Sequence, residues 1–231
     1  MTDVTASIEF LADSPRYKTE RPYIYHPGIK DGCSADDPRL TNISFASIDV
    51  FIPDVRSVPA REQGLDVAGF EVVEHESNHL DFLSAKCIEE YQEETENLLR
   101  EHLQAEAVMC CRSILRLNAP RTQDEIVDIG NPLTLDRPPR GAHVDFTFEG
   151  APTLIHERLR EDLKAKYFQP GYRFRLVNTW RPLLPVVEDR PLAVCDFRSI
   201  NPQDLLSADR ITPNRTSELY YLLYRKSQSW F

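Results

Sequence analysis

A histidine and an aspartate stand two residues apart at His143 and Asp145, within the segment 140–147. Residues two apart on a β-strand point to the same side, so both side chains could converge on one ion while Val144 faces the core. Two histidines and one carboxylate are the ligands with which non-heme iron(II) sites hold one face of the metal. The pair therefore predicts two of the three ligands of such a site. The alternative is a partly exposed strand start at which both residues bond to neighbours.

The remaining histidines do not complete this set by spacing. His156, on a predicted helix, is the one histidine that follows Asp145, and it could be a third ligand or a solvent-facing helix residue. Two of the others lie four residues apart but lack the zinc-binding HExxH arrangement. The four that precede the pair are His26, His75, His79 and His102.

Two helices are predicted around the pair. Apolar residues recur at helical spacing over 84–106, with Glu and Gln between them, and a second helix is predicted over 152–167. Between the first helix and the pair, 108–117 is predicted as a strand, and prolines punctuate the loop that follows it.

The rest of the chain favours short strands. Over 173–180 apolar and polar residues alternate, which is typical of a strand with one buried face. Helices that lead into a run of short strands indicate an α+β chain whose sheet folds over a core. The other predicted extended segments are 22–25, 48–53, 70–74, 192–196 and 218–224.

Composition narrows the function classes. A net charge of −10 without a basic stripe argues against nucleic-acid binding, and the absence of a long apolar run argues against a membrane span. The start of the chain lacks a signal-peptide pattern, so we expect a cytoplasmic protein. Five cysteines without a CxxC pair predict reduced, mostly buried thiols rather than a disulfide framework.

Four motifs carry a resemblance to a known family. The long signature Asn-Thr-Trp-Arg-Pro-Leu followed by Pro-Leu-Ala-Val-Cys-Asp-Phe-Arg-Ser is the most specific part of it. With these motifs the chain resembles the fungal hydroxylase/desaturase family typified by AsaB, which also includes a gibberellin desaturase and CmcJ-like proteins. The resemblance covers roughly 84–231, and the N-terminal third matches loosely. The motifs lie at 140–147, 173–183, 191–199 and 204–206.

The resemblance implies a double-stranded β-helix (jelly-roll) enzyme. Such an enzyme uses Fe(II) and 2-oxoglutarate to hydroxylate or desaturate a small molecule, commonly in fungal secondary-metabolite biosynthesis. His143 and Asp145 match the first two metal ligands of the family. We therefore expect residues 84–231 to form the oxygenase-like domain and 1–83 to form a strand and loop extension packed on it, as a single folding unit.

Further signature positions match as well. Asn178 could lie near the co-substrate and Arg181 could bind its carboxylate, so both are candidate cofactor-binding residues. Asn178 could instead be a buried amide bonded to the backbone. Arg181 could instead join Asp196 and Arg198 in a structural ion-pair network, because buried arginine and aspartate usually occur paired.

Members of the family usually continue past the equivalent of Phe231, with a distal histidine and an arginine that grips 2-oxoglutarate. The resemblance therefore predicts a core that is incomplete at its C-terminal side, with an exposed sheet edge through which homo- or hetero-oligomers could form. Two other functions remain open, namely a catalytically impaired or accessory protein of the same fold and a non-oxidative jelly-roll isomerase or cyclase.

Overall fold

The structure is a computed structural model that describes residues 3–26, 37, 39–118 and 131–231. It divides into two compact units. The first comprises Met1–Val72, Arg140–Leu154 and Leu192–Phe231, and the second comprises Val73–Pro139 and Ile155–Pro191. The predicted division into a 1–83 extension and an 84–231 core stays a prediction.

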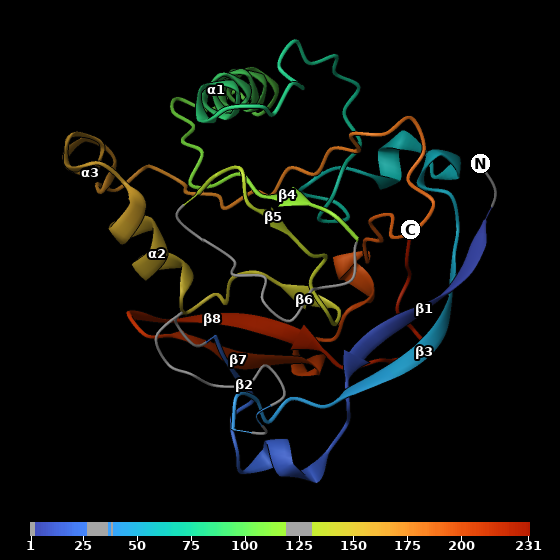
Figure 1. Cartoon of the computed structure of the whole chain (residues 1–231). Coiled ribbons are helices and arrows are strands. Elements are labelled where there is room, and N and C mark those ends of the chain that lie inside the picture. The colour runs from blue at the N-terminus through green and yellow to red at the C-terminus, as the bar shows by residue number, and fades with distance from the viewer. Residues whose placement is uncertain (1–2, 27–36, 38, 119–130) are drawn as a thin grey trace. The chain divides into compact units, whose positions relative to one another are not determined.

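A four-stranded sheet organises the first unit (Figure 1). Its order is β2 (Tyr23–Tyr25), β7 (Leu205–Thr212), β8 (Arg215–Leu222) and β6 (His143–Val144). The pair β2 and β7 is parallel, and the other two pairs are antiparallel. The long β7–β8 hairpin is rich in apolar and aromatic residues and forms the centre of the sheet, so the short β6 with its histidine is added to one edge of β8.

A second pair of strands supplies the rest of the core. β1 (Val4–Leu11) and β3 (Phe45–Ile52) pair antiparallel along their whole length. Because side chains alternate along a strand, neighbouring residues of β1 enter different core clusters: Leu11 packs with Tyr221, and Phe10 packs with Trp230. The Phe10 and Trp230 rings meet edge to face at 5.6 Å. Full burial of a ring such as that of Phe10 contributes about 2–3 kcal/mol.

Short elements connect these strands. Val194 exchanges two backbone hydrogen bonds of 2.8 Å with Phe231, so the predicted strand over 192–196 is reduced to an extended segment with one bridge, between Cys195 and Trp230. The described residues of this unit also form five single-turn 3-10 helices: Pro15–Lys18, Val55–Ser57, Ala60–Glu62, Phe197–Ser199 and Pro202–Asp204.

The second unit contains helices and one short pair of strands. α1 (Ala85–His102) is capped by Ser84, whose hydroxyl accepts a hydrogen bond from the amide of Cys87 at 3.3 Å. α3 (Glu161–Tyr167) follows later, and β4 (Leu115–Arg116) pairs parallel with β5 (Leu135–Asp136). α2 (Ala151–Arg158) runs across the division between the units.

The predicted elements agree in part with the structure. The helix over 84–106 and the α+β class are confirmed, while the helix over 152–167 is two helices, α2 and α3. The strand over 108–117 is reduced to β4. The strands over 173–180 and 70–74 are wrong, because 173–180 has no regular structure and 70–74 has only an isolated bridge at Phe70. Alternation marks a face that can be buried, but a strand also needs a hydrogen-bonded neighbour, which local sequence does not reveal.

The cysteines differ in burial from the prediction. The four in the described part of the chain are free, as expected, but Cys87, Cys110 and Cys195 are half-buried and Cys111 is exposed. Cys33 lies outside the described residues. Across those residues no helix is long and apolar enough to cross a membrane.

Candidate functional site

His143 is fixed by its neighbours on both sides of its ring. It lies opposite Tyr221 across β6 and β8, and the two ring centroids are 6.2 Å apart. Its Nδ1 atom is 2.7 Å from the carbonyl oxygen of Gly141. A carbonyl only accepts, so Nδ1 donates its hydrogen there and Nε2 keeps its lone pair in the neutral ring. This is the arrangement in which metal-binding histidines are usually held.

Asp145 converges with His143 as predicted. Its Oδ1 atom is 3.5 Å from His143 Nε2, and both side chains are partly buried. Adjacent ligands of one first-row metal lie about 3 Å apart, so the two atoms fit neighbouring positions around one ion. β6 ends at Val144, however, and Asp145 belongs to the bend that follows. The prediction that Val144 faces the core is wrong, because its side chain is 46% exposed. Here the two-residue strand presents its outer face to solvent.

The residues before His143 are held against β1 and β3. The amide of Ala142 donates to the carbonyl of Glu9 at 2.7 Å, and the Arg140 guanidinium donates from Nε to the Glu9 carboxylate at 3.0 Å. Arg140 also lies over the Phe45 ring, 5.3 Å from its centroid. The hydrogen bond that Arg140 donates to Glu9 raises the pKa of Arg140. The turn that presents His143 is therefore fastened by two separate strands.

Sequence reasoning missed this support from Glu9, although a signal for β1 is present. Val4, Ala6, Ile8 and Phe10 alternate with polar residues, which is the period of a half-buried strand.

The third metal ligand is not assigned by the geometry. Among residues 3–26, 37, 39–118 and 131–231, no three His, Cys, Asp or Glu side chains are grouped to hold an ion. His156 is exposed on α2 in the second unit, where its ring stacks on that of Phe168 with centroids 5.8 Å apart. Its role as a third ligand stays a prediction.

Asn178 and Arg181 lie in the second unit, in a segment without regular structure. The Arg181 guanidinium uses all three of its nitrogens: Nη1 donates to the carbonyl of His75 at 2.8 Å, Nη2 donates to Nδ1 of the same residue at 2.8 Å, and Nε donates to the Tyr91 hydroxyl at 3.3 Å. Arginine does not accept hydrogen bonds, so Nδ1 of His75 must be unprotonated. Nδ1 of His75 also lies 3.9 Å from Glu94, and an ion pair there would need a protonated Nδ1. The shorter contact with Arg181 outweighs this longer one.

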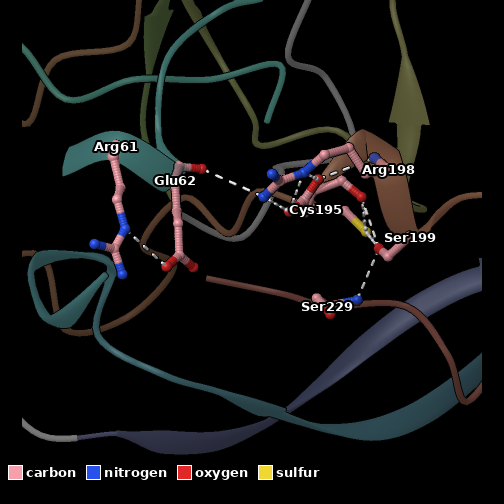
Figure 2. A network of polar contacts seen from close by, with 7 residues as sticks. Arg61, Glu62, Cys195, Arg198, Ser199 and Ser229 are labelled. Atoms are coloured by element: carbon pink, nitrogen blue, oxygen red, sulfur yellow. Dashed lines mark hydrogen bonds and ion pairs between the residues drawn. The ribbon is translucent and has the colours of Figure 1, made fainter. Parts of the chain in front are cut away.

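Asp196 and Arg198 form an ion pair, as the structural alternative predicted, but Arg181, which that alternative placed in the same network, bonds to His75 and Tyr91 instead. The Asp196 carboxylate accepts from the backbone amide and from Nε of Arg198, both at 2.9 Å, and so begins the short helix Phe197–Ser199. The hydrogen bond from Arg198 lowers the pKa of Asp196. Figure 2 shows Arg198 reaching the carbonyl of Glu62, and Ser199 accepting from the amide of Ser229. These signature positions therefore join segments of the first unit.

The chain is similar in sequence to several fungal hydroxylases, desaturases and dioxygenases. It is 28% identical over 201 residues to the hydroxylase/desaturase efuI of Hormonema carpetanum, a match that covers 82% of this chain and 64% of that protein. It is 29% identical over 169 residues to the alpha-ketoglutarate-dependent dioxygenase phiK of a fungal species, with 71% of this chain and 56% of that protein covered. The chain thus matches less than two thirds of the length of these relatives.

A solved structure shares the fold. A variant of the iron and alpha-ketoglutarate-dependent endoperoxidase NvfI superposes with a TM-score of 0.74 at 22% identity, covering 100% of this chain and 78% of that one. A family model described as YDMC, an oxidoreductase/YMDC permease-like domain, matches residues 9–231. The chain therefore belongs to this oxidoreductase family, together with the fungal hydroxylases and desaturases.

Proposed function

We propose that the chain is an Fe(II)- and 2-oxoglutarate-dependent oxidoreductase that hydroxylates or desaturates a small molecule in fungal secondary-metabolite biosynthesis. The observation that carries the proposal is the approach of His143 Nε2 to Asp145 Oδ1 at 3.5 Å, with Nδ1 of the histidine occupied by Gly141. The names of the relatives support iron and 2-oxoglutarate as cofactors. A jelly-roll core is part of the same proposal.

The residues of the site suit this role. Iron bound here would be held by Nε2 of His143 and an oxygen of Asp145, and it would supply the oxidation of substrate by dioxygen. The carbonyl of Gly141 keeps the Nδ1 proton in place, so that the lone pair of Nε2 stays directed away from that carbonyl. The Tyr221 ring packs against the histidine and limits its rotation.

Two residues are candidates for binding the co-substrate. Asn178 stays a candidate for a place near 2-oxoglutarate, on the strength of the resemblance. Arg181 stays a candidate for its carboxylate, but the three contacts of Arg181 with His75 and Tyr91 favour a structural role within the second unit.

Anaerobic Fe(II) binding and 2-oxoglutarate turnover test the proposal. We expect the chain to bind Fe(II) and to form succinate when oxygen is admitted, and His143→Ala and Asp145→Ala each to lose at least tenfold in iron affinity. The matched control is His102→Ala, because that histidine lies in the exposed last turn of α1. No iron binding by the unaltered chain would refute the proposal. Iron binding without succinate formation would favour the accessory-protein function instead.

A further inference from the structure

Thr147 is a polar residue in a position that proteins usually fill with an apolar one. Its side chain is 1% exposed, which places it with Phe10, Leu11 and Ile88 as the largest fully buried side chains in the described part of the chain. It follows Asp145 by two residues. Burying a hydroxyl is costly unless it is hydrogen-bonded, so this position demands partners.

Both hydrogen-bonding functions of the Thr147 hydroxyl are used. Oγ1 donates to Oε2 of Glu218 at 2.7 Å and accepts from the amide of Gly150 at 2.8 Å. The backbone carbonyl of Thr147 accepts from the amide of Ala151 at 3.0 Å. The threonine therefore closes the turn that follows Asp145 and ties this turn to β8.

Glu218 is itself held in place by Arg21. Asp209 and Glu218 are directly opposed in the β7–β8 register, where two like charges would repel each other. The Arg21 guanidinium lies between them, with Nη2 2.5 Å from Glu218 Oε1 and Nε 2.8 Å from Asp209 Oδ1. The hydrogen bonds from Thr147 and then from Arg21 lower the pKa of Glu218. The glutamate is thus kept ionised as an acceptor for Thr147.

A second residue of the same strand fixes the same turn. The Tyr220 hydroxyl donates to Oε2 of Glu149 at 2.7 Å and accepts from the amide of Phe148 at 3.3 Å. Glu218 and Tyr220 are two apart on β8 and so share a face, whereas Tyr221, which packs on His143, belongs to the other face. The anchor of the turn therefore lies on the opposite side of the sheet from the His143 ring.

We propose that Thr147, Glu218 and Arg21 are positioning residues that hold the turn after β6 so that the Asp145 carboxylate stays beside His143. The expected effect of these residues on metal affinity rests on the proposed function. The hydrogen bonds of Thr147 reach Glu218 and Gly150, so these residues act on Asp145 through the backbone of 145–150.

Hydrogen exchange of the metal-free chain tests the positioning itself. Thr147→Val keeps the shape of the side chain but removes both hydrogen bonds of the hydroxyl, while Thr147→Ser keeps the hydroxyl. We expect amides of 145–150 to exchange at least tenfold faster in Thr147→Val and close to the unaltered rate in Thr147→Ser. The matched control is Thr212→Val, because that hydroxyl donates to the Arg215 carbonyl at 2.9 Å at the far end of the hairpin. Unchanged exchange over 145–150 in Thr147→Val would overturn the inference.

Titration with Co(II) alone tests the consequence. Thr147→Val should bind Co(II) about tenfold more weakly than the unaltered chain, whereas Thr147→Ser and Thr212→Val should bind it normally. Equal affinities for Thr147→Val and the unaltered chain, with His143→Ala still deficient, would overturn the inference and leave the proposed function standing. Absence of Co(II) binding by the unaltered chain would count against the proposed function, and the exchange measurement would then decide the positioning role.

Discussion

Gly141 lies directly against the ring of Phe45, with its backbone in the left-handed region at φ +76°. A Cβ atom at Gly141 would overlap the ring carbons of Phe45. The carbonyl of Gly141 is the group to which His143 Nδ1 donates. A residue without a side chain is therefore required at position 141 for its carbonyl to accept the hydrogen bond from His143.

Gly141→Ala should destabilise the chain and weaken its metal binding. The left-handed backbone costs an alanine about 1–2 kcal/mol, and the overlap with Phe45 adds about 1–3 kcal/mol. We expect a fall of roughly 2–5 kcal/mol in the free energy of unfolding, measured with urea, and a loss of about tenfold in Fe(II) affinity.

Gly64→Ala is the control for backbone strain. Gly64 has φ +113°, but the nearest atom to a Cβ there, on Val67, is 3.8 Å away, which is ordinary contact. Gly64→Ala should lower the free energy of unfolding by about 1–2 kcal/mol and leave the iron affinity unchanged. Equal losses of stability at Gly64 and Gly141 would show that the ring of Phe45 moves aside at little cost.

The convergence of His143 and Asp145 could be predicted because it depends on residues two apart in the chain. The anchor of the same turn could not. Thr147 and Glu218 are 71 residues apart, and nothing in the local sequence pairs them. Their contact follows from the pairing of β6 with β8, which is a long-range interaction set by packing of the core. The predicted strand over 173–180 was wrong for a related reason: its alternation is clear, but no strand among the described residues pairs with it.

Asp196→Asn should lower stability more at neutral pH than in acid. The Arg198 guanidinium holds the pKa of Asp196 below its ordinary value. A lowered carboxyl pKa contributes stability that is present above the unfolded pKa, near pH 4, and is lost as the pH falls through the folded pKa. Asparagine can still begin the 3-10 helix, so the substitution removes mainly the charge interaction. We expect a difference of about 1 kcal/mol at pH 7, kept small because the Arg198 side chain is 47% exposed.

Urea midpoints of the two proteins at pH 7, 5 and 3.5 provide the measurement. The difference between the unaltered chain and Asp196→Asn should shrink as the pH falls. The control is Asp189→Asn. The pKa of Asp189 is also lowered, but first by a hydrogen bond with the neutral Asn118, and both residues lie in the second unit. A difference that grows toward acid would contradict the assignment of Asp196 as an ionised partner of Arg198.

Arg181→Ala should act on stability rather than on 2-oxoglutarate. Its guanidinium donates to the carbonyl and Nδ1 of His75 and to the Tyr91 hydroxyl, so its loss leaves several acceptors of the second unit without their donor. Hydrogen bonds of charged groups are worth about 1.5–3 kcal/mol, and we expect a loss of about 2–3 kcal/mol in the free energy of unfolding. Arg181→Lys should recover only part of this loss. The lysine ammonium can still donate hydrogen bonds, but it cannot reproduce the planar fork of arginine.

Arg100→Ala is the matched control on α1, because Arg100 is exposed and its side chain donates to Asn97 of its own helix, at 2.6 Å. It should cost less than about 0.5 kcal/mol. The competing role predicts a different pattern: an arginine that binds the carboxylate of 2-oxoglutarate would, when changed to lysine, raise the KM for 2-oxoglutarate at least tenfold and leave the unfolding midpoint unchanged. That pattern would return Arg181 to the co-substrate site, because a side chain that holds His75 and Tyr91 together cannot be replaced without a cost in stability.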